Sequence, residues 1–394
     1  MGAGHGHESR PRASERTTAI LSWIVGVVLF VTAMGAAAVW PDDFSFRGSL
    51  DSTAEGARWV SAEVTAIGDD GSVVAVIAGE EDTGDRSMTV FNDPTVVLHV
   101  GDRVRALELP TGELGFSDFE RGSPMLWLFI AFVVIVIAVA WWRGLGALLG
   151  LVVAFGVVVF FTIPALFDGA HPLVVGLVTG SGALFVLLYL AHGPNARTTT
   201  AYLGTLAGLA VTTVLAWWAV DASKLHGLWS EDGVHLEFFN RNVSLSGMLL
   251  CGIILAGLGV LNDVTVTQAS AVWELRSARP DLDWWQLYVR GMRIGRDHIA
   301  STVYTIAFAY VGAALPTLML VSMYDTGLGT TLTSSDIAEE VVRTLVGSIG
   351  LVLAVPLTTL IGALVVAGDS VRPPRETIPT ESSHKGAPGV DGRE

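Results

Sequence analysis

The chain has 394 residues, of which 51% are hydrophobic and 15% are charged, and apolar runs of about 20 residues, long enough to cross a bilayer core, recur along it. The sequence therefore predicts a polytopic α-helical membrane protein. The net charge of −15, without a basic patch among aromatic residues, argues against nucleic-acid partners, and the single cysteine, Cys251, excludes an intrachain disulfide and a cysteine metal cluster.

The N-terminal residues 1–17 are polar and glycine-rich, so we expect a disordered cytoplasmic tail. An apolar span over residues 18–40 follows it. A signal peptide likewise has positively charged residues before its apolar region, but that region is shorter and ends in a small-residue cleavage site. Because residues 36–38 offer only a weak site of this kind, the sequence favours an uncleaved transmembrane anchor.

Residues 41–123 differ from the rest of the chain, because short strand-like stretches alternate there with breaks that hold Gly and Asp. This spacing predicts a small extracytoplasmic all-β domain, a barrel or a sandwich, and an OB-like barrel is one option. The lone His99 is expected to be structural. The predicted strands are WVSAEVTAI, SVVAVIA, MTVFN, TVVLHV and DRVRALEL.

Seven further apolar spans lie within residues 124–367, so the sequence predicts about eight transmembrane helices in all. The last span is long for one crossing, which indicates either a tilted helix or a start outside the hydrocarbon. Residues 368–394 are rich in Pro, Ser and Gly and predict a disordered cytoplasmic tail. The seven spans are 124–142, 145–166, 173–191, 199–220, 243–261, 299–323 and 337–367.

The Lys and Arg residues set the expected orientation. The short loops near Asp168 and Asp325 carry no Lys or Arg, whereas the loop over residues 263–298 holds five arginines. Cytoplasmic loops carry the excess of positive charge. We therefore expect a plasma-membrane protein with both termini in the cytoplasm and the β domain outside.

Small residues at four-residue spacing predict a compact bundle, because they let helices approach closely in lipid. One such face also carries polar groups: Asp263, Thr267 and Glu274 follow small residues along one side of a helix that leaves the membrane. This stripe faces a partner or is a solvated extension, and periodicity alone does not decide between them. The G-x-x-x-G pairs are Gly146 and Gly150, Gly176 and Gly180, and Gly204 and Gly208.

After Pro280 the chain combines aromatic and basic residues in a way that suits the headgroup layer. We expect Asp281 or Asp283 to cap a helix that lies in the membrane plane on the cytoplasmic side, and Gly295 to end it. Its membrane-interface anchors would be Trp284, Trp285, Arg290 and Arg293.

The next span opens on Asp297 and His298. His298 is a side chain that can titrate near neutral pH, and Asp297, Ser301 and Thr305 share one face of the helix. Pro316 lacks an N–H group and leaves a carbonyl that protein, water or an ion must satisfy. Either these groups bind an ion, or Asp297 merely caps a helix start.

In the last span, Glu339 and Arg343 are four residues apart, which predicts an ion pair. This pair is either a gate at the outer surface or a purely structural contact.

Four stretches together resemble the signature segments of the YibE/F-like family of bacterial multi-pass membrane proteins. They are NDVTVTQASAVWEL, GRDHIASTVYTIAFAYVGAALP, EEVVRTLVGSIGLVLAVPLTT and HGPNARTTTAYLGTL. The resemblance covers roughly residues 121–367, and the preceding β domain fits the usual layout of the family. It implies a plasma-membrane protein of the permease type, and it supplies no substrate or catalytic residue.

The first hypothesis is a permease-like transporter of unknown substrate. Asp263, Asp297 and His298, with Thr267, Ser301 and Thr305, would bind a proton or cation, and Glu339 with Arg343 would form the gate. The alternative is a non-transporting envelope scaffold whose β domain binds a partner. No H-E-x-x-H, G-x-S-x-G or P-loop occurs in the sequence, so we predict no enzyme activity, no cofactor and no metal.

Overall fold

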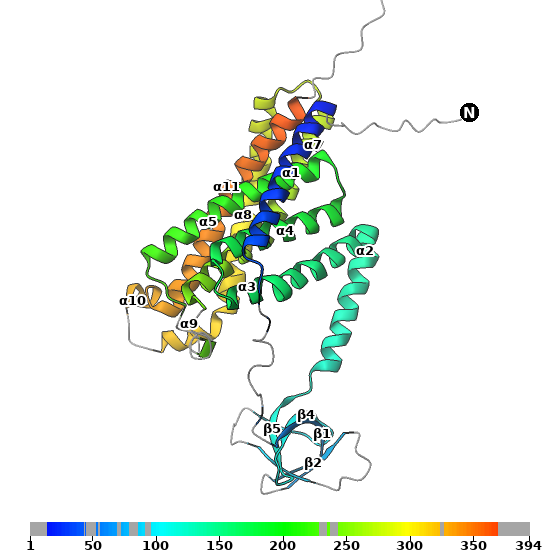
Figure 1. Ribbon diagram of the computed structural model, residues 1–394, viewed down its shortest axis with the longest axis vertical. Coiled ribbons are helices and arrows are strands. Elements are labelled where there is room, and N and C mark those ends of the chain that lie inside the picture. The colour runs from blue at the N-terminus through cyan, green and yellow to red at the C-terminus, as the bar shows by residue number, and fades with distance from the viewer. Residues whose placement is uncertain are drawn as a thin grey trace, which may run out of the picture.

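A computed structural model describes residues 14–42, 44, 53, 56–68, 72–78, 86–90, 96–227, 235–236, 243–323 and 327–368. The two predicted tails, 1–17 and 368–394, lie outside these residues except for 14–17 and 368. Helices dominate the described chain, and a small β barrel precedes most of them (Figure 1).

The barrel contains five strands: β1 (Arg58–Ile67), β2 (Val73–Ile77), β3 (Arg86–Thr89), β4 (Arg103–Glu108) and β5 (Leu114–Phe119). They close in the order β1-β2-β3-β5-β4, with β3 parallel to β5 and β1 antiparallel to β4. Alternate residues of each strand, such as Ala62, Val64 and Ala75, point into a buried core. This order is the strand order of an OB-like barrel, as the sequence allowed.

One predicted strand of the barrel was wrong and one strand was missed. Val96–His99, inside the predicted strand TVVLHV, has no strand structure, and Val97 and Val100 are each 64% exposed. The missed strand is β5, whose sequence LGFSDF contains Gly and Asp and has low intrinsic strand preference. Its pairing with β3 and β4 closes the barrel, so tertiary contacts override local preference there.

The first membrane helix, α1 (Glu15–Ala38), begins at Ser14, whose hydroxyl accepts a hydrogen bond from the Thr17 N–H. It packs chiefly on α4 (Pro172–His192). Thr32 on α1 and Ser181 on α4 share a hydroxyl–hydroxyl hydrogen bond of 2.9 Å, which fixes the register of the two helices.

After the barrel comes a 46-residue helical segment, Gly122–Phe167. It consists of α2 (Gly122–Val157), a π-helical turn η1 (Val158–Thr162) and α3 (Ile163–Phe167). Trp141 interrupts α2 with φ 53° and ψ −135°, a backbone conformation that is costly for a residue with a side chain. Figure 1 shows the two arms of α2 meeting at a sharp bend.

This segment explains why the structure has fewer candidate membrane spans than the sequence predicted. Among the described residues, six helices are long and apolar enough to cross a membrane, or seven when the bent pair α8–α9 counts as one span. The sequence predicted about eight, because it divided the segment into the spans 124–142 and 145–166. The structure keeps both in one helical run that bends at Trp141.

The centre of the bundle is formed by α5 (Ala196–Ala222), α7 (Leu245–Ala278) and α11 (Ser335–Ala367), which pack against one another. Helix α8 (Trp284–Ala313) lies on α11 and α7, and it is followed by the short helices α9 (Leu315–Ser322) and α10 (Leu328–Leu332). The buried apolar residues of α5 and α7 form the main core, with Val346 and Ala354 from α11.

The contact between α5 and α11 is an interlocking of Thr side chains with Gly positions, which we call the α5–α11 seam. A Cβ added to Gly204 would overlap the side chain of Thr358, and one added to Gly350 would overlap Thr212. A Cβ added to Gly208 would come within 2.9 Å of Ala354 Cβ. The close-packing role predicted for the Gly204 and Gly208 pair is therefore confirmed.

Candidate functional site

The best candidate site is a pocket between the end of α8, α9, α10 and the first turns of α11. Its volume is about 670 Å³, within the range of small-molecule sites. A second cavity of about 500 Å³ lies among α1, α2, η1 and α4 and has no ionisable residue in its lining. We therefore focus on the first, which we call the elbow pocket.

A break in the membrane helix creates the elbow pocket. Helix α8 ends at Ala313, and α9 leaves it at an angle of 64°. Pro316 stands in the first turn of α9, where its missing N–H group costs nothing. The sequence predicted one span over 299–323, whereas the structure divides it at Ala314. The divided helix no longer runs alongside α11, which leaves space between the two.

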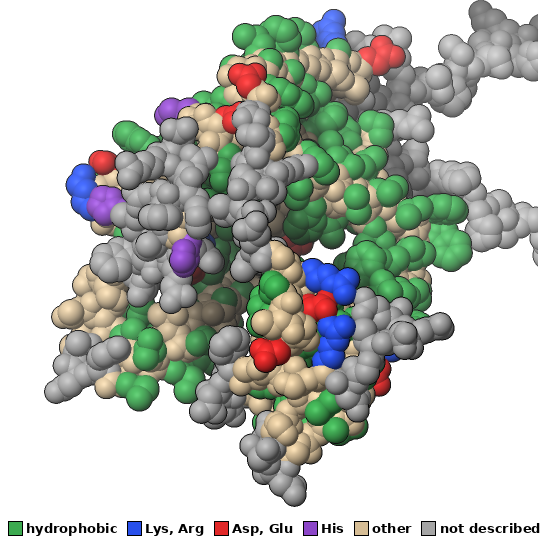
Figure 2. Space-filling model, turned by 60° about the horizontal axis from the view of Figure 1, so that its bottom comes forward, with side chains coloured by type: hydrophobic (Ala, Val, Ile, Leu, Met, Phe, Trp, Pro, Cys, Tyr) green, Lys and Arg blue, Asp and Glu red, His purple; other side chains and the backbone are tan. Residues whose placement is uncertain are grey.

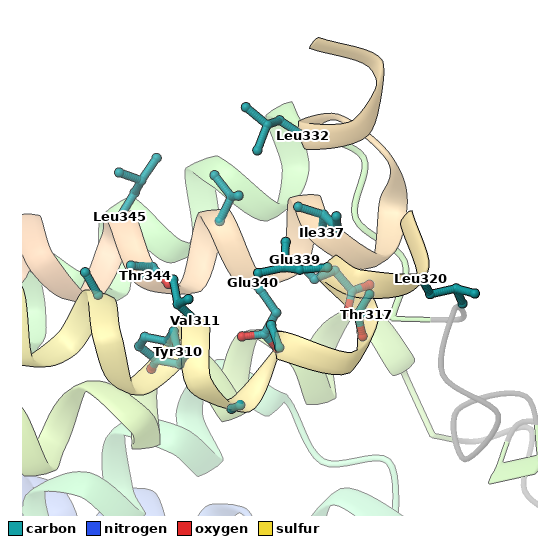
Figure 3. A pocket seen from close by; sticks show the side chains of 15 residues that line it. Tyr310, Val311, Thr317, Leu320, Leu332, Ile337, Glu339, Glu340, Thr344 and Leu345 are labelled. Atoms are coloured by element: carbon teal, nitrogen blue, oxygen red, sulfur yellow. The ribbon is translucent and has the colours of Figure 1, made fainter. Parts of the chain in front are cut away.

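The lining of the elbow pocket combines carboxylates with hydroxyls. Figure 3 shows Glu339, Glu340 and Thr344 on α11 facing Tyr310 and Thr317 of the α8–α9 segment. The remaining lining residues are mostly apolar, with Val311, Leu318, Ile337 and Leu345 among them. Such a site can hold a solute that is partly apolar and carries one polar or charged group.

The predicted ion pair between Glu339 and Arg343 is replaced in the structure by a pair between Arg343 and Glu340. Arg343 Nη1 donates to Glu340 Oε1 at 2.6 Å. Glu339 Oε1 accepts a hydrogen bond from the Gly227 N–H at 3.1 Å, which ties α11 to the loop after α5. Glu340 and Arg343 are three positions apart, and this spacing places them on one face of the helix as well as a spacing of four does.

The predicted ion-binding residues lie elsewhere. Asp263 and Thr267 are exposed on the surface of α7, and Asp297, Ser301 and Thr305 are exposed on α8. None of them lines the elbow pocket. The Thr267 hydroxyl donates to the Asp263 carbonyl at 2.8 Å, and that of Thr305 donates to the Ser301 carbonyl at 3.2 Å. These hydroxyls therefore bond to their own helices.

His298 differs from these neighbours because it is half-buried. Its Nε2 atom is buried and has no hydrogen-bond partner among the described residues. Asp297, the next residue, points to the exposed side of the helix. Both residues lie in the middle of α8 rather than at a helix start, on sides of the helix that differ in exposure.

Comparison with known proteins identifies one family. The model of the family described as YibE/F-like protein matches residues 128–368, which run from α2 to the end of α11. The chain belongs to the YibE/F-like family. Comparisons with curated proteins and with solved structures gave no match. The β barrel lies outside the matched residues, so the family assignment rests on the bundle of this YibE/F-like protein.

The in-plane helix predicted after Pro280 is wrong. In this YibE/F-like protein α8 continues without a break from Trp284 to Ala313 and includes Gly295. A Cβ on Gly295 would come within 2.5 Å of Val355 Cγ1, so this glycine permits close packing with α11. The predicted cap is confirmed at Asp283, whose carboxylate accepts from the Gln286 N–H at 2.7 Å.

The proposed membrane anchors are all exposed on the first turns of α8. Trp284 is 43% exposed and Trp285 is 55% exposed, and Arg290 and Arg293 lie on the surface of the same helix. Their position at the end of a long membrane helix is compatible with an anchoring role.

Sequence reasoning missed a buried polar contact that ties three helices together. Gln268 on α7 is 2% exposed, and its Nε2 donates to the Gly291 carbonyl of α8 at 2.9 Å and to Thr359 Oγ1 of α11 at 2.7 Å. The available signal was the position of Gln268 between Val264 and Val272 at steps of four, on a face that is otherwise apolar. This contact joins α7, α8 and α11.

Proposed function

We propose that this YibE/F-like protein is a permease-like membrane protein that carries a small solute through the elbow pocket. The observation that carries the proposal is a cavity of about 670 Å³ at a broken membrane helix. Irregular backbone at membrane depth is tolerated where it lines a cavity, and discontinuous helices are common at the binding sites of transporters.

The topology proposed from the loops has both termini in the cytoplasm of a plasma-membrane protein. The bent segment Gly122–Phe167 has 46 residues and spans about 69 Å of helix at 1.5 Å per residue. A bilayer core is about 30 Å thick, so the two arms are proposed to cross separately. This raises the number of crossings to eight and returns the chain to the side on which it began.

Ion coupling is a separate part of the proposal. Asp263, Asp297 and His298 are the proposed proton- or cation-binding groups, with Thr267, Ser301 and Thr305 beside them. The buried Nε2 of His298 supports this role, because a new donor or acceptor would satisfy it. Glu339 and Arg343 are the proposed gate residues beside the elbow pocket.

Proton movement tests the proposal directly. The full-length protein is reconstituted into liposomes that enclose a pH-sensitive dye, and a membrane potential is applied. We expect proton flux that is lost in Asp297→Asn and His298→Ala and retained in Glu113→Gln, a control on the surface of the barrel. Flux equal to that of protein-free liposomes contradicts transport. Flux that both variants leave unchanged contradicts the assignment of these residues.

A second candidate function is an envelope scaffold, and one observation on the barrel favours it. Trp59 is 42% exposed, and the Arg105 guanidinium lies 5.7 Å from the centre of its ring. Exposed Trp–Arg pairs are frequent at protein interfaces. Figure 2 shows basic and acidic side chains intermingled on the barrel face turned toward the viewer. If the protein is a scaffold, deletion of residues 44–120 abolishes its function while the bundle still assembles.

A further inference from the structure

We propose that the first turns of α8 bind the headgroup of an anionic phospholipid. The binding surface is formed by Arg290, Arg293 and Arg296, which are all exposed and which we call the arginine stripe. The stripe lies about 21 Å along α8 from Tyr310 of the elbow pocket, at 1.5 Å per residue. Lipid binding there requires no transport.

The three arginines share one exposed side of α8. Steps of three residues displace successive side chains by only about 60° around the helix axis. Trp285 and Val289, which are 55% and 44% exposed, lie on the same side. Large apolar side chains among arginines are poorly placed in bulk water, but they suit the headgroup layer, where apolar and charged surfaces meet. This composition argues against the alternative, a helix end that is simply solvated.

The exposed side of α8 changes character directly after the arginine stripe. The residues that continue it, Ala300, Tyr304 and Phe308, carry no charge, and the last two are 65% and 76% exposed. Helices α8 and α9 together are long and apolar enough to cross a membrane. The hydrocarbon is therefore expected to begin near Ala300. The stripe, which extends about 9 Å along the helix, then lies at the level of the lipid phosphates.

The guanidinium groups of the arginine stripe have no ion-pair partner in the protein. In the part of the chain that the structure describes, none of the three forms an ion pair. Arg290 contributes to the low pKa of Asp281, but the hydrogen bonds to that carboxylate come from Arg279. Asp297, the carboxylate next to the stripe, is exposed. Three guanidinium groups thus face one carboxylate that pairs with none of them.

A phospholipid matches both parts of this surface. Guanidinium groups bind phosphate oxygens through two parallel N–H···O hydrogen bonds, and the acyl chains of the same lipid would lie beside Tyr304 and Phe308. A zwitterionic headgroup also brings a cation toward the arginines, whereas phosphatidylglycerol brings none. The stripe therefore favours an anionic lipid, by about fivefold in affinity for each arginine.

Fluorescence quenching at one labelled position tests this assignment. Full-length protein with Cys251→Ala and Ala300→Cys carries a bimane label one turn beyond Arg296. It is placed in phosphatidylcholine nanodiscs with a small fraction of phosphatidylglycerol or phosphatidylcholine that is spin-labelled close to the headgroup. We expect about tenfold or greater preference for phosphatidylglycerol in quenching. At Phe308→Cys, about 18 Å along the helix from the stripe, the two lipids should quench equally.

The variants separate the arginine stripe from other positive charge. The combined changes Arg290→Gln, Arg293→Gln and Arg296→Gln are expected to remove the preference for phosphatidylglycerol. Arg293→Gln alone should reduce it about fivefold. The matched control combines Arg16→Gln and Arg143→Gln, which remove exposed arginines from α1 and α2, and it should leave the preference unchanged. Thermal unfolding of each variant shows that it is folded.

Equal quenching by the two lipids in the labelled parent protein, or a preference that the triple variant retains, overturns the assignment. A preference that is lost in phosphate buffer but kept in chloride buffer of equal ionic strength means that the arginines bind free phosphate, and it overturns the lipid headgroup as the ligand. A preference that depends on the arginine stripe, in a protein without liposome flux, supports lipid binding and overturns only transport.

Discussion

Helix α11 serves two regions with opposite character. Its C-terminal half forms the α5–α11 seam, where Thr358 and Ala354 fit against Gly204 and Gly208 and are fully buried. Its N-terminal half lines the elbow pocket with Glu339, Glu340 and Thr344. The seam follows a step of four residues with small side chains on both helices. The pocket appears where the facing helix breaks and charged residues replace small ones.

This difference shows that polar residues in a membrane helix do not by themselves indicate a pathway. The hydroxyls of Thr205 and Thr265 hydrogen-bond to each other at 2.6 Å and join α5 to α7, and the seam threonines Thr212 and Thr358 fit against glycines of the facing helix. The elbow pocket requires in addition that α8 and α9 diverge by 64°.

The largest effect is expected at the α5–α11 seam. Gly204→Ala places a methyl group against Thr358, and overpacking of this kind costs about 1–3 kcal/mol. The matched control is Gly182→Ala on α4, because a Cβ there meets nothing within 4 Å. Thermal unfolding in detergent should show a lower Tm for the first variant only. Equal Tm values for the two variants would mean that the seam is not tightly packed.

The buried polar contact should give the next largest loss. Gln268→Leu leaves Thr359 and the Gly291 carbonyl without the amide donor, which costs about 1–3 kcal/mol. In the double variant with Thr359→Val part of this loss should return, because both side-chain partners are then apolar. A double-mutant cycle on Tm measures the coupling, and strict additivity of the two changes argues against a shared hydrogen bond.

An effect of intermediate size is expected at the bend at Ala314. Pro316→Ala restores an N–H group and lets the chain continue α8 more nearly straight. A spin-label distance between α9 and the start of α11 should shorten. An unchanged distance would show that contacts other than Pro316 maintain the 64° angle.

The smallest effect is expected at the exposed turn between α7 and α8. Hydrogen bonds from Arg279 lower the pKa of Asp281 to about 2. The depressed pKa of this carboxyl gives a small stabilisation that is present above about pH 4 and is lost as the pH falls toward 2. Hydrogen exchange of the turn should therefore become faster, relative to Asp281→Asn, only as the pH falls through this range. A constant ratio between the two proteins speaks against the ion pair.

Much of the fold could be predicted because hydrophobic spans and strand alternation are local patterns. The barrel and the long apolar helices follow from them. The bend at Trp141 could not be predicted, because a positive φ at a tryptophan has no local sequence signal. Gly295 was interpreted as a helix breaker although it serves close packing, and the sequence does not show which helix lies opposite.

The candidate site was predicted only in part. The sequence marks Glu339 and Arg343 as a charged pair and Pro316 as a perturbed position, but nothing in it places the α8–α9 bend opposite the first turns of α11. Asp263 and Asp297 stand out in the sequence because ionisable groups inside membrane spans are rare and often functional. The structure leaves both exposed, because their helix faces turn away from the neighbours that α7 and α8 pack against.

The most direct test compares two threonines of α11 by cysteine labelling. Cys251 is the only cysteine of the chain, so Cys251→Ala supplies a cysteine-free background into which Thr344→Cys or Thr358→Cys is introduced. In nanodiscs, a membrane-impermeant thiol reagent should label the first variant, while the second should stay unlabelled because Thr358 is fully buried in the α5–α11 seam. Equal labelling of both positions, or no labelling at Thr344→Cys, would contradict a water-accessible elbow pocket beside a dry seam.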